Sequence, residues 1–345
     1  MELKFHKAVR KTVPLIMSIA GTSGSGKTYS ALLLAAGLAG PNGKVGLLDT
    51  ENGRGCFYAD SPGIIAALPN GFEIMDLVAP FSPARYIEAI DAAERAGINV
   101  LVIDSGSHEW EGTGGCSEIA ANDKGRWNNA KLANRRYVYR LLYSTMHIIV
   151  CLRAREKSKI IPKSESKTGK EEVLSLGIQP IAEKNFIFEM LLSLQLDEQT
   201  HFAVPLKVPE PLSGLFKGDR MITKNDGERI REWNQTGAAG DPVENLKKRA
   251  LEAANDGVAS YARFFQSITP QQRKLLAGDT HDANKKIAEA ADKAVPAFGS
   301  ADNPVEWPES FEGPVCIFNG DRYEYCEESS GYRKVDAAQA TDKAA

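Results

Sequence analysis

The chain has 345 residues, of which 43% are hydrophobic and 25% charged, and its formal net charge is −3. These values suit a soluble globular protein of one large domain or two smaller ones, which buries a core without disulfides or metals. The longest apolar run, residues 31–39, is too short to cross a bilayer, and the five scattered cysteines form no CxxC pair, so a membrane span and a disulfide framework are both excluded.

Cationic residues precede the apolar stretch at 13–20 and resemble the start of a signal peptide. A buried strand that leads into a glycine-rich loop explains the same residues better. We therefore expect no export and a cytoplasmic location.

Strands and helices alternate along the first 235 residues. Strands are expected at 13–20, 44–51, 71–78, 98–104, 146–154, 186–197 and 201–208. Helices are expected at 27–40, 82–97 and 127–145. The alternation predicts an α/β fold with a mostly parallel central sheet covered on both faces.

The pattern changes after Trp233. Residues 234–240 read as a linker, and helix start signals follow at Asp241 and Thr269. Asn319-Gly320 between alternating apolar residues predicts a β-hairpin. We expect an α/β domain at 1–235, a helical appendage at 241–295, a small β-hairpin region at 304–335 and a disordered tail at 336–345.

Charge is unevenly distributed along the chain. Residues 124–170 hold 13 Lys and Arg against 2 Asp and Glu, whereas residues 301–345 hold 4 against 10. The net charge of the whole chain therefore conceals one cationic stretch and one anionic end.

The loop between the first strand and the first helix carries the phosphate-loop pattern, GxxxxGKT. Its backbone N–H groups surround phosphate oxygens, Lys27 reaches the β- and γ-phosphates, and the Thr28 hydroxyl binds Mg²⁺. The pattern thus predicts ATP and Mg²⁺ as ligands. The expected nucleotide-binding residues are Gly21, Thr22, Ser23, Gly24, Ser25, Gly26, Lys27, Thr28 and Tyr29.

Acidic residues follow two other predicted strands. Asp104 ends a continuous apolar strand, where it would help to hold Mg²⁺. Glu51 is the expected general base, Glu109 is the competing candidate, and Asp49 is expected to bond loop backbone groups. Ser105 and His108 are candidate sensors of the γ-phosphate.

Three segments together, "GTSGSGKT", "LLDTENGRG" and "VLVIDSGSHEWEG", resemble the RecA-like ATPases. The resemblance covers residues 13–235 and implies that Glu51, at the end of the strand after the phosphate-loop helix, is the catalytic base. "HIIVCLRAR" and "LKVPEPLSGLF" look like the phage-encoded members, some of which promote single-strand annealing. By resemblance, Arg153 couples the γ-phosphate to DNA-binding loops, and Lys207 is a cation contributed to a neighbouring subunit.

The cationic stretch suits single-stranded DNA, because phosphates take the charge while bases stack on interleaved aromatics. Its second half, 153–170, has few apolar anchors and is expected to be a mobile loop. The candidate DNA-binding residues are Arg126, Lys131, Arg135, Arg136, Arg155, Lys157, Lys159, Lys163 and Lys167.

Several functions remain open at this point. The first is a DNA-stimulated recombination ATPase that forms homo-oligomers on single strands, with a single-strand-binding or replication protein as a further candidate partner. The others are an ATP-driven loader or remodeller of a helicase or packaging machine, a slow nucleotide-dependent switch, and a small-molecule kinase.

Overall fold

The computed structural model describes residues 8, 10–161, 172–239, 242–294, 315–318, 321–326 and 331–335. The chain divides into two compact units, residues 1–245 and 246–345. Within the described ranges, every helix is too short or too polar to traverse a bilayer.

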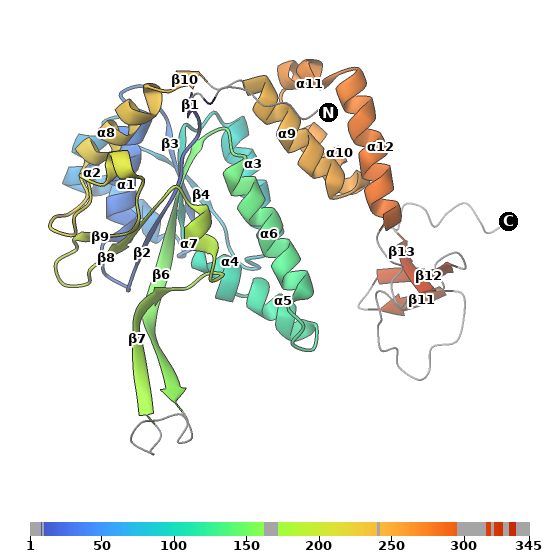
Figure 1. Ribbon diagram of the computed structural model, residues 1–345, viewed down its shortest axis with the longest axis horizontal. Coiled ribbons are helices and arrows are strands. Elements are labelled where there is room, and N and C mark those ends of the chain that lie inside the picture. Colours follow the sequence, from blue (N-terminus) through green and yellow to red (C-terminus); the bar gives the residue numbers. More distant parts are fainter. Residues whose placement is uncertain are drawn as a thin grey trace. The chain divides into compact units, whose positions relative to one another are not determined.

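The first unit contains the expected sheet, with strand order β4-β3-β5-β6-β2-β8-β9 (Figure 1). Its strands are β2 Ile16–Gly21, β3 Val45–Asp49, β4 Glu73–Asp76, β5 Val100–Asp104, β6 His147–Ile161, β8 Leu192–Leu196 and β9 Ala203–Lys207. All neighbours pair in parallel except β8 and β9, which are antiparallel. The predicted mostly parallel α/β fold is therefore confirmed, together with the antiparallel option for its last two strands.

Helices cover both faces of this sheet. They are α1 Lys27–Ala39, α2 Pro62–Ala67, α3 Pro83–Arg95, α4 Ser107–Glu111, α5 Cys116–Asn122, α6 Asn128–Leu142, α7 Phe186–Glu189 and α8 Lys224–Gln235, with the 3-10 helices η1 Arg54–Asp60 and η2 Glu210–Leu212. A short parallel pair, β1 Lys11–Thr12 and β10 Ala238–Ala239, joins the two ends of the unit.

Alternate residues of each central strand enter two separate cores. Met17 and Ile19 of β2 pack with α1, α2 and α8, whereas Ile16 and Ala20 pack with α3, α6 and α7. A strand buried on both faces needs apolar residues at every position, which explains the continuous apolar runs in the sequence.

Two predictions in this unit were wrong. Residues 186–189 form the short helix α7 and not the start of a strand, because an apolar run alone does not distinguish a buried strand from a helix. The expected mobile loop after Arg153 is largely a two-stranded ribbon: β6 continues to Ile161 and pairs with the antiparallel β7, Glu172–Pro180 (Figure 1). Residues 162–171 lie outside the described residues.

The second unit contains helices and a small antiparallel sheet. Its elements are α9 Pro242–Asn255, which begins in the first unit, α10 Val258–Ser267, α11 Pro270–Leu276, α12 Asp279–Ala294, β11 Val315–Phe318, β12 Asp321–Cys326 and β13 Gly331–Val335. The predicted helix start at Thr269 is confirmed by a capping box with Gln272. The predicted hairpin pairs β11 with β12, but β13 adds a third strand, and its Asn319-Gly320 turn and the expected tail lie outside the described residues.

Candidate functional site

The phosphate loop joins β2 to α1, as the sequence predicts. Gly24 and Gly26 adopt φ angles of 83° and 85°, a left-handed conformation that residues other than glycine rarely adopt. Lys27 Nζ donates to the Thr22 carbonyl oxygen at 2.7 Å, and Ser25 Oγ donates to the same oxygen at 2.9 Å. The loop is therefore closed on itself by its own lysine and serine.

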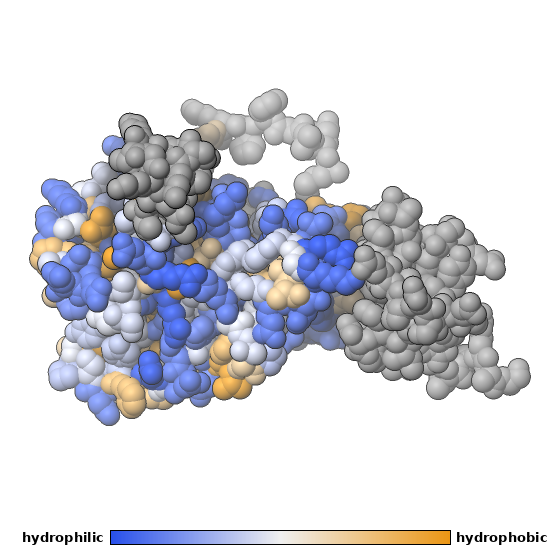
Figure 2. All heavy atoms as spheres, turned by 90° about the horizontal axis from the view of Figure 1, so that it is seen from below, coloured by the Kyte–Doolittle hydropathy of each residue, from blue (hydrophilic) through white to orange (hydrophobic). Residues whose placement is uncertain are grey.

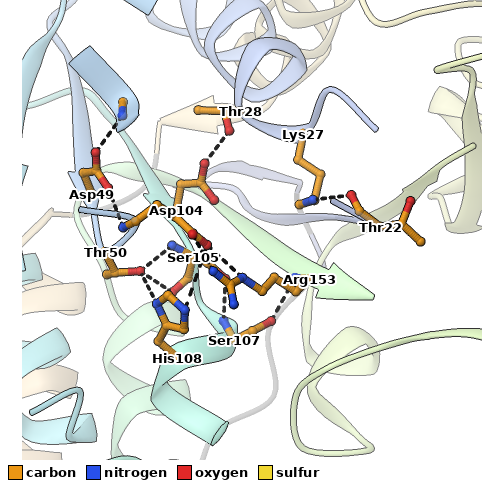
Figure 3. A network of polar contacts seen from close by, with 12 residues as sticks. Thr22, Lys27, Thr28, Asp49, Thr50, Asp104, Ser105, Ser107, His108 and Arg153 are labelled. Carbon is orange, nitrogen blue, oxygen red and sulfur yellow. Dashed lines mark hydrogen bonds and ion pairs between the residues drawn. The ribbon is translucent and has the colours of Figure 1, made fainter. Parts of the chain in front are cut away.

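Thr28 and Asp104 meet beside this loop. The Thr28 hydroxyl donates to Asp104 Oδ2 across the gap between α1 and β5 (Figure 3). Burial raises the pKa of Asp104, while the Thr28 hydrogen bond and the charge of Lys27 oppose that shift. A hydroxyl and a carboxylate are both oxygen ligands, so this donor pair fits Mg²⁺, which takes few protein ligands and keeps water and substrate phosphates.

Glu51 lies just beyond β3 and is held by Arg153 at the end of the sheet portion of β6. Arg153 Nε donates to Glu51 Oε1 at 2.8 Å, and Nη2 bonds Oε2. Burial alone would raise the pKa of Glu51, but the hydrogen bonds and charge of Arg153 bring this pKa below its usual value. Glu51 is therefore an ionised carboxylate at neutral pH.

The candidate sensor residues take part in a polar network with Thr50 and Ser107 (Figure 3). Thr50 Oγ1 accepts from the Ser105 N–H at 2.7 Å and lies 2.7 Å from His108 Nδ1. Burial and the charge of Arg153 lower the pKa of His108, so its Nε2, 4.0 Å from Glu51, carries no charge at pH 7. Ser107 connects this network to β6, because its Oγ accepts from the Arg153 N–H at 2.9 Å.

A cleft of about 640 Å³ opens over these groups and is lined by Lys27, Thr28, Glu51, Asp104 and Arg153. Its other wall comes from η1, through Arg54, Phe57 and Tyr58. Three cations and two carboxylates thus line one cavity at the carboxyl ends of parallel strands, where α/β proteins bind ligands.

Ser105, His108 and Tyr29 do not line this cleft. Ser105 is fully buried, and His108 stacks on Phe81 behind Thr50. Tyr29 lies on α1 with its ring 6.4 Å from that of Tyr58. Any influence of these residues on a bound phosphate would therefore pass through their neighbours.

Glu109, the competing general base, lies elsewhere. It is buried in α4, where Cys116 Sγ donates at 3.2 Å and Asn134 Nδ2 donates to both carboxylate oxygens at 3.1–3.2 Å. Burial raises the pKa of Glu109 to about 7. Because Glu109 does not line the cleft, its position does not fit general-base catalysis there.

The predicted DNA-binding residues fall on two elements. Arg126, Lys131, Arg135 and Arg136 are exposed at and along α6, and Arg155 and Lys157 are exposed on β6. Arg155 forms a two-pronged ion pair with Glu111. Lys159 lies farther along β6, and Lys163 and Lys167 fall outside the described residues.

Lys207 and Arg140 serve local contacts. Lys207 Nζ donates to the Phe188 carbonyl oxygen on the sheet edge, away from the cleft lining. Arg140, within the cationic stretch, points inward to Asp91 and Glu94, each at 2.8 Å, so it does not contribute to an exposed cationic face.

Sequence reasoning missed Arg54, Thr50 and the aromatic wall of η1. The two glycines flanking Arg54 in "NGRG" were a usable signal, because they indicate a tightly turned loop directly after the proposed base. The face in Figure 2, coloured by hydropathy, is mostly hydrophilic with small separate apolar patches.

A family model described as an AAA domain matches residues 14–229. No curated protein matches the chain. Among solved structures, the RadB recombinase is similar at 18% identity and a TM-score of 0.36, over 59% of this chain and 84% of that one. A KaiC-like protein from the hyperthermophilic archaeon Pyrococcus horikoshii is similar at 14% identity and a TM-score of 0.33, over 59% and 89%. These scores are low, so the function is inferred from the site and the family match.

Proposed function

The chain belongs to the AAA domain family and is a P-loop ATPase, and from that premise we propose that it hydrolyses ATP while acting on single-stranded DNA in recombination or strand annealing. Lys27 binds the phosphates, and Thr28 and Asp104 would hold Mg²⁺, which in such sites neutralises charge on the β- and γ-phosphates. Glu51 orients a water molecule and accepts its proton.

The observation that carries the DNA part of this proposal is the course of β6. This strand passes Arg153, the partner of Glu51, and continues directly into the ribbon that carries Arg155, Lys157 and Lys159. Single-stranded DNA that bound to the ribbon would therefore contact β6, the same element that holds Glu51, the proposed general base. This continuity supports ATP hydrolysis that responds to DNA. A further part of the proposal is a homo-oligomer in which Lys207 is contributed to the nucleotide site of a neighbouring subunit.

An ATPase assay with and without a poly-dT oligonucleotide tests the proposal. We expect single-stranded DNA to raise the rate of hydrolysis by the wild-type protein. Glu51→Gln should bind ATP but hydrolyse it 100-fold more slowly or worse, and Lys27→Ala should lose ATP binding.

Three results would contradict parts of this proposal. A rate that DNA leaves unchanged would favour the remodelling of another protein. Tight ATP binding without turnover would favour the slow switch. Unchanged affinity of Lys27→Ala for ATP would overturn the phosphate-loop assignment.

A further inference from the structure

The three cations of the cleft differ in what they contact. Lys27 bonds the phosphate loop itself, and Arg153 is paired with Glu51. Arg54 is exposed and makes no hydrogen bond or ion pair with any residue that the structure describes, yet it lines the same cavity. Among the described residues that line the cleft, it is thus the one cation without a hydrogen-bond or ion-pair partner, although its charge acts on nearby Glu51.

The loop that carries Arg54 is fixed at both ends by one buried carboxylate. Asp49 Oδ1 accepts from the Glu51 N–H at 2.5 Å, and its Oδ2 accepts from the Gly55 N–H at 2.7 Å. A Cβ on Gly55 would lie 2.5 Å from Leu47 Cδ2 and 2.9 Å from Asp49 Oδ2, so a larger residue here would displace the side chains that hold the loop. Asp49 therefore holds Arg54 beside Glu51.

We propose that Arg54 binds the γ-phosphate of the nucleotide held by its own chain and stabilises the transition state of hydrolysis in cis. This inference rests on the proposed ATPase function and goes beyond it by assigning a residue. Arg153 is held by Glu51 and Lys27 by the phosphate loop, so Arg54 is the cation of this cleft that is left to meet the γ-phosphate.

The reaction step defines what Arg54 does. The water oxygen bonds to the γ-phosphorus as the bond to the β–γ bridging oxygen breaks, and ADP leaves with that electron pair. One water proton passes to Glu51. The Arg54 guanidinium donates hydrogen bonds to the transferring phosphoryl oxygens and stabilises the charge that develops on them.

Kinetics and binding of two variants test this role. Arg54→Ala should lower kcat at least 100-fold and weaken the binding of a non-hydrolysable ATP analogue, with ADP affinity and the melting temperature unchanged. Arg54→Lys should recover part of kcat. Arg95→Ala, which removes an exposed arginine at the end of α3 and outside the cleft, is the matched control and should behave as wild type.

A mixing experiment separates action in cis from action in trans. Arg54→Ala protein is mixed with Glu51→Gln protein, which retains Arg54 but cannot use its own base. Under the proposal the mixture stays as inactive as its components, whereas recovered hydrolysis would mean that Arg54 serves a neighbouring subunit. A kcat of Arg54→Ala within threefold of wild type would overturn the assignment outright. Absence of hydrolysis by the wild-type protein would instead count against the proposed function.

Discussion

At the scale of single residues, the proposed general base, Glu51, is paired with an arginine. Arg153 bonds both carboxylate oxygens of Glu51, and a carboxylate engaged on both oxygens has less capacity to accept a proton from water. Arg153 thus lowers the basicity of Glu51 in addition to fixing its orientation.

Replacing Arg153 tests this relation through the pH dependence of the rate. The hydrogen bonds and charge of Arg153 depress the pKa of Glu51, so Arg153→Ala should raise that pKa. Since the base must be ionised, the acidic limb of the kcat/KM profile should move to higher pH. The measurement is a pH–rate profile between pH 4 and 8, with Arg155→Ala on the same strand as the control. An unmoved limb in Arg153→Ala would mean that Glu51 is not the titrating base.

Residues defined by local pattern were predictable, whereas those defined by distant contacts were not. Lys27 and Thr28 follow from the glycine spacing, and Asp104 follows from its place at a strand end. The pairing of Arg153 with Glu51 joins residues 102 positions apart, and no local pattern encodes it. Arg54 is exposed and follows no periodic pattern, so it is identified only by its place in the lining of the cleft.

At the scale of elements, Glu109 ties three helices together. It lies on α4 and bonds Cys116 on α5 and Asn134 on α6, in a region without a strand. Trp110 and Trp127 stack at 5.4 Å beside it. A buried carboxyl that accepts three hydrogen bonds fixes a small helical layer that has little apolar core of its own.

The raised pKa of Glu109 gives a testable dependence of stability on pH. The native state holds the proton up to about pH 7, whereas the unfolded carboxyl loses it near 4.5. The free energy of unfolding should therefore fall as pH rises from 4.5 through 7, by about 3 kcal/mol from this group.

Glu109→Gln removes that titration, because the amide stays neutral at every pH. Urea unfolding of the two proteins at pH 5 and pH 8 provides the measurement. The stability of Glu109→Gln relative to wild type should increase at pH 8, and a difference independent of pH would show that Glu109 is ionised in the native state.

The β6–β7 ribbon was the least predictable element. Its first strand is rich in lysine and arginine, which suggested a loop, and a bulge at Gly177, with a φ of 74°, interrupts the register of its second strand. Each strand supplies the hydrogen-bond partners of the other, so the sequence of one segment alone does not predict a strand. By contrast, β2, β3 and β5 are apolar throughout and were predictable.

Neutralising the ribbon tests where DNA binds. Replacing Lys157, Lys159, Lys163 and Lys167 together with glutamine should weaken single-strand binding and flatten its salt dependence, because fewer counterions are released on binding. ATP binding should persist. The matched control replaces the lysines at 217, 274, 285 and 286, and both proteins are measured across a salt series. Full affinity with an unchanged salt slope would place the DNA site elsewhere.

At the scale of the whole molecule, charge separates along the chain. The last 45 residues carry 10 acidic and 4 basic side chains, opposite in sign to the stretch at 124–170. An anionic segment competes with phosphate for a cationic surface when the two can meet. The alternative is that the acidic segment stays solvated and does not contact the cationic stretch.

Truncation after Val295 tests the competition. If the acidic end occupies the cationic residues, the shortened protein should bind single-stranded DNA more tightly at low salt, and the difference should vanish as salt rises. Fluorescence anisotropy of a labelled oligonucleotide measures both effects. Equal affinity at every salt concentration would exclude competition by this segment.

The continuity of β6 has a mechanical consequence. β6 pairs with β5 as far as Cys151 and with β2 as far as Arg153, and from Ala154 onward it pairs with β7. Fifteen extended residues span about 50 Å, so one continuous strand runs from the central sheet into the ribbon. The register shift between Glu156 and Ser158 is the point where the β6–β7 ribbon can bend. A force applied to the ribbon therefore acts three to five residues from Arg153, the residue that holds the proposed base.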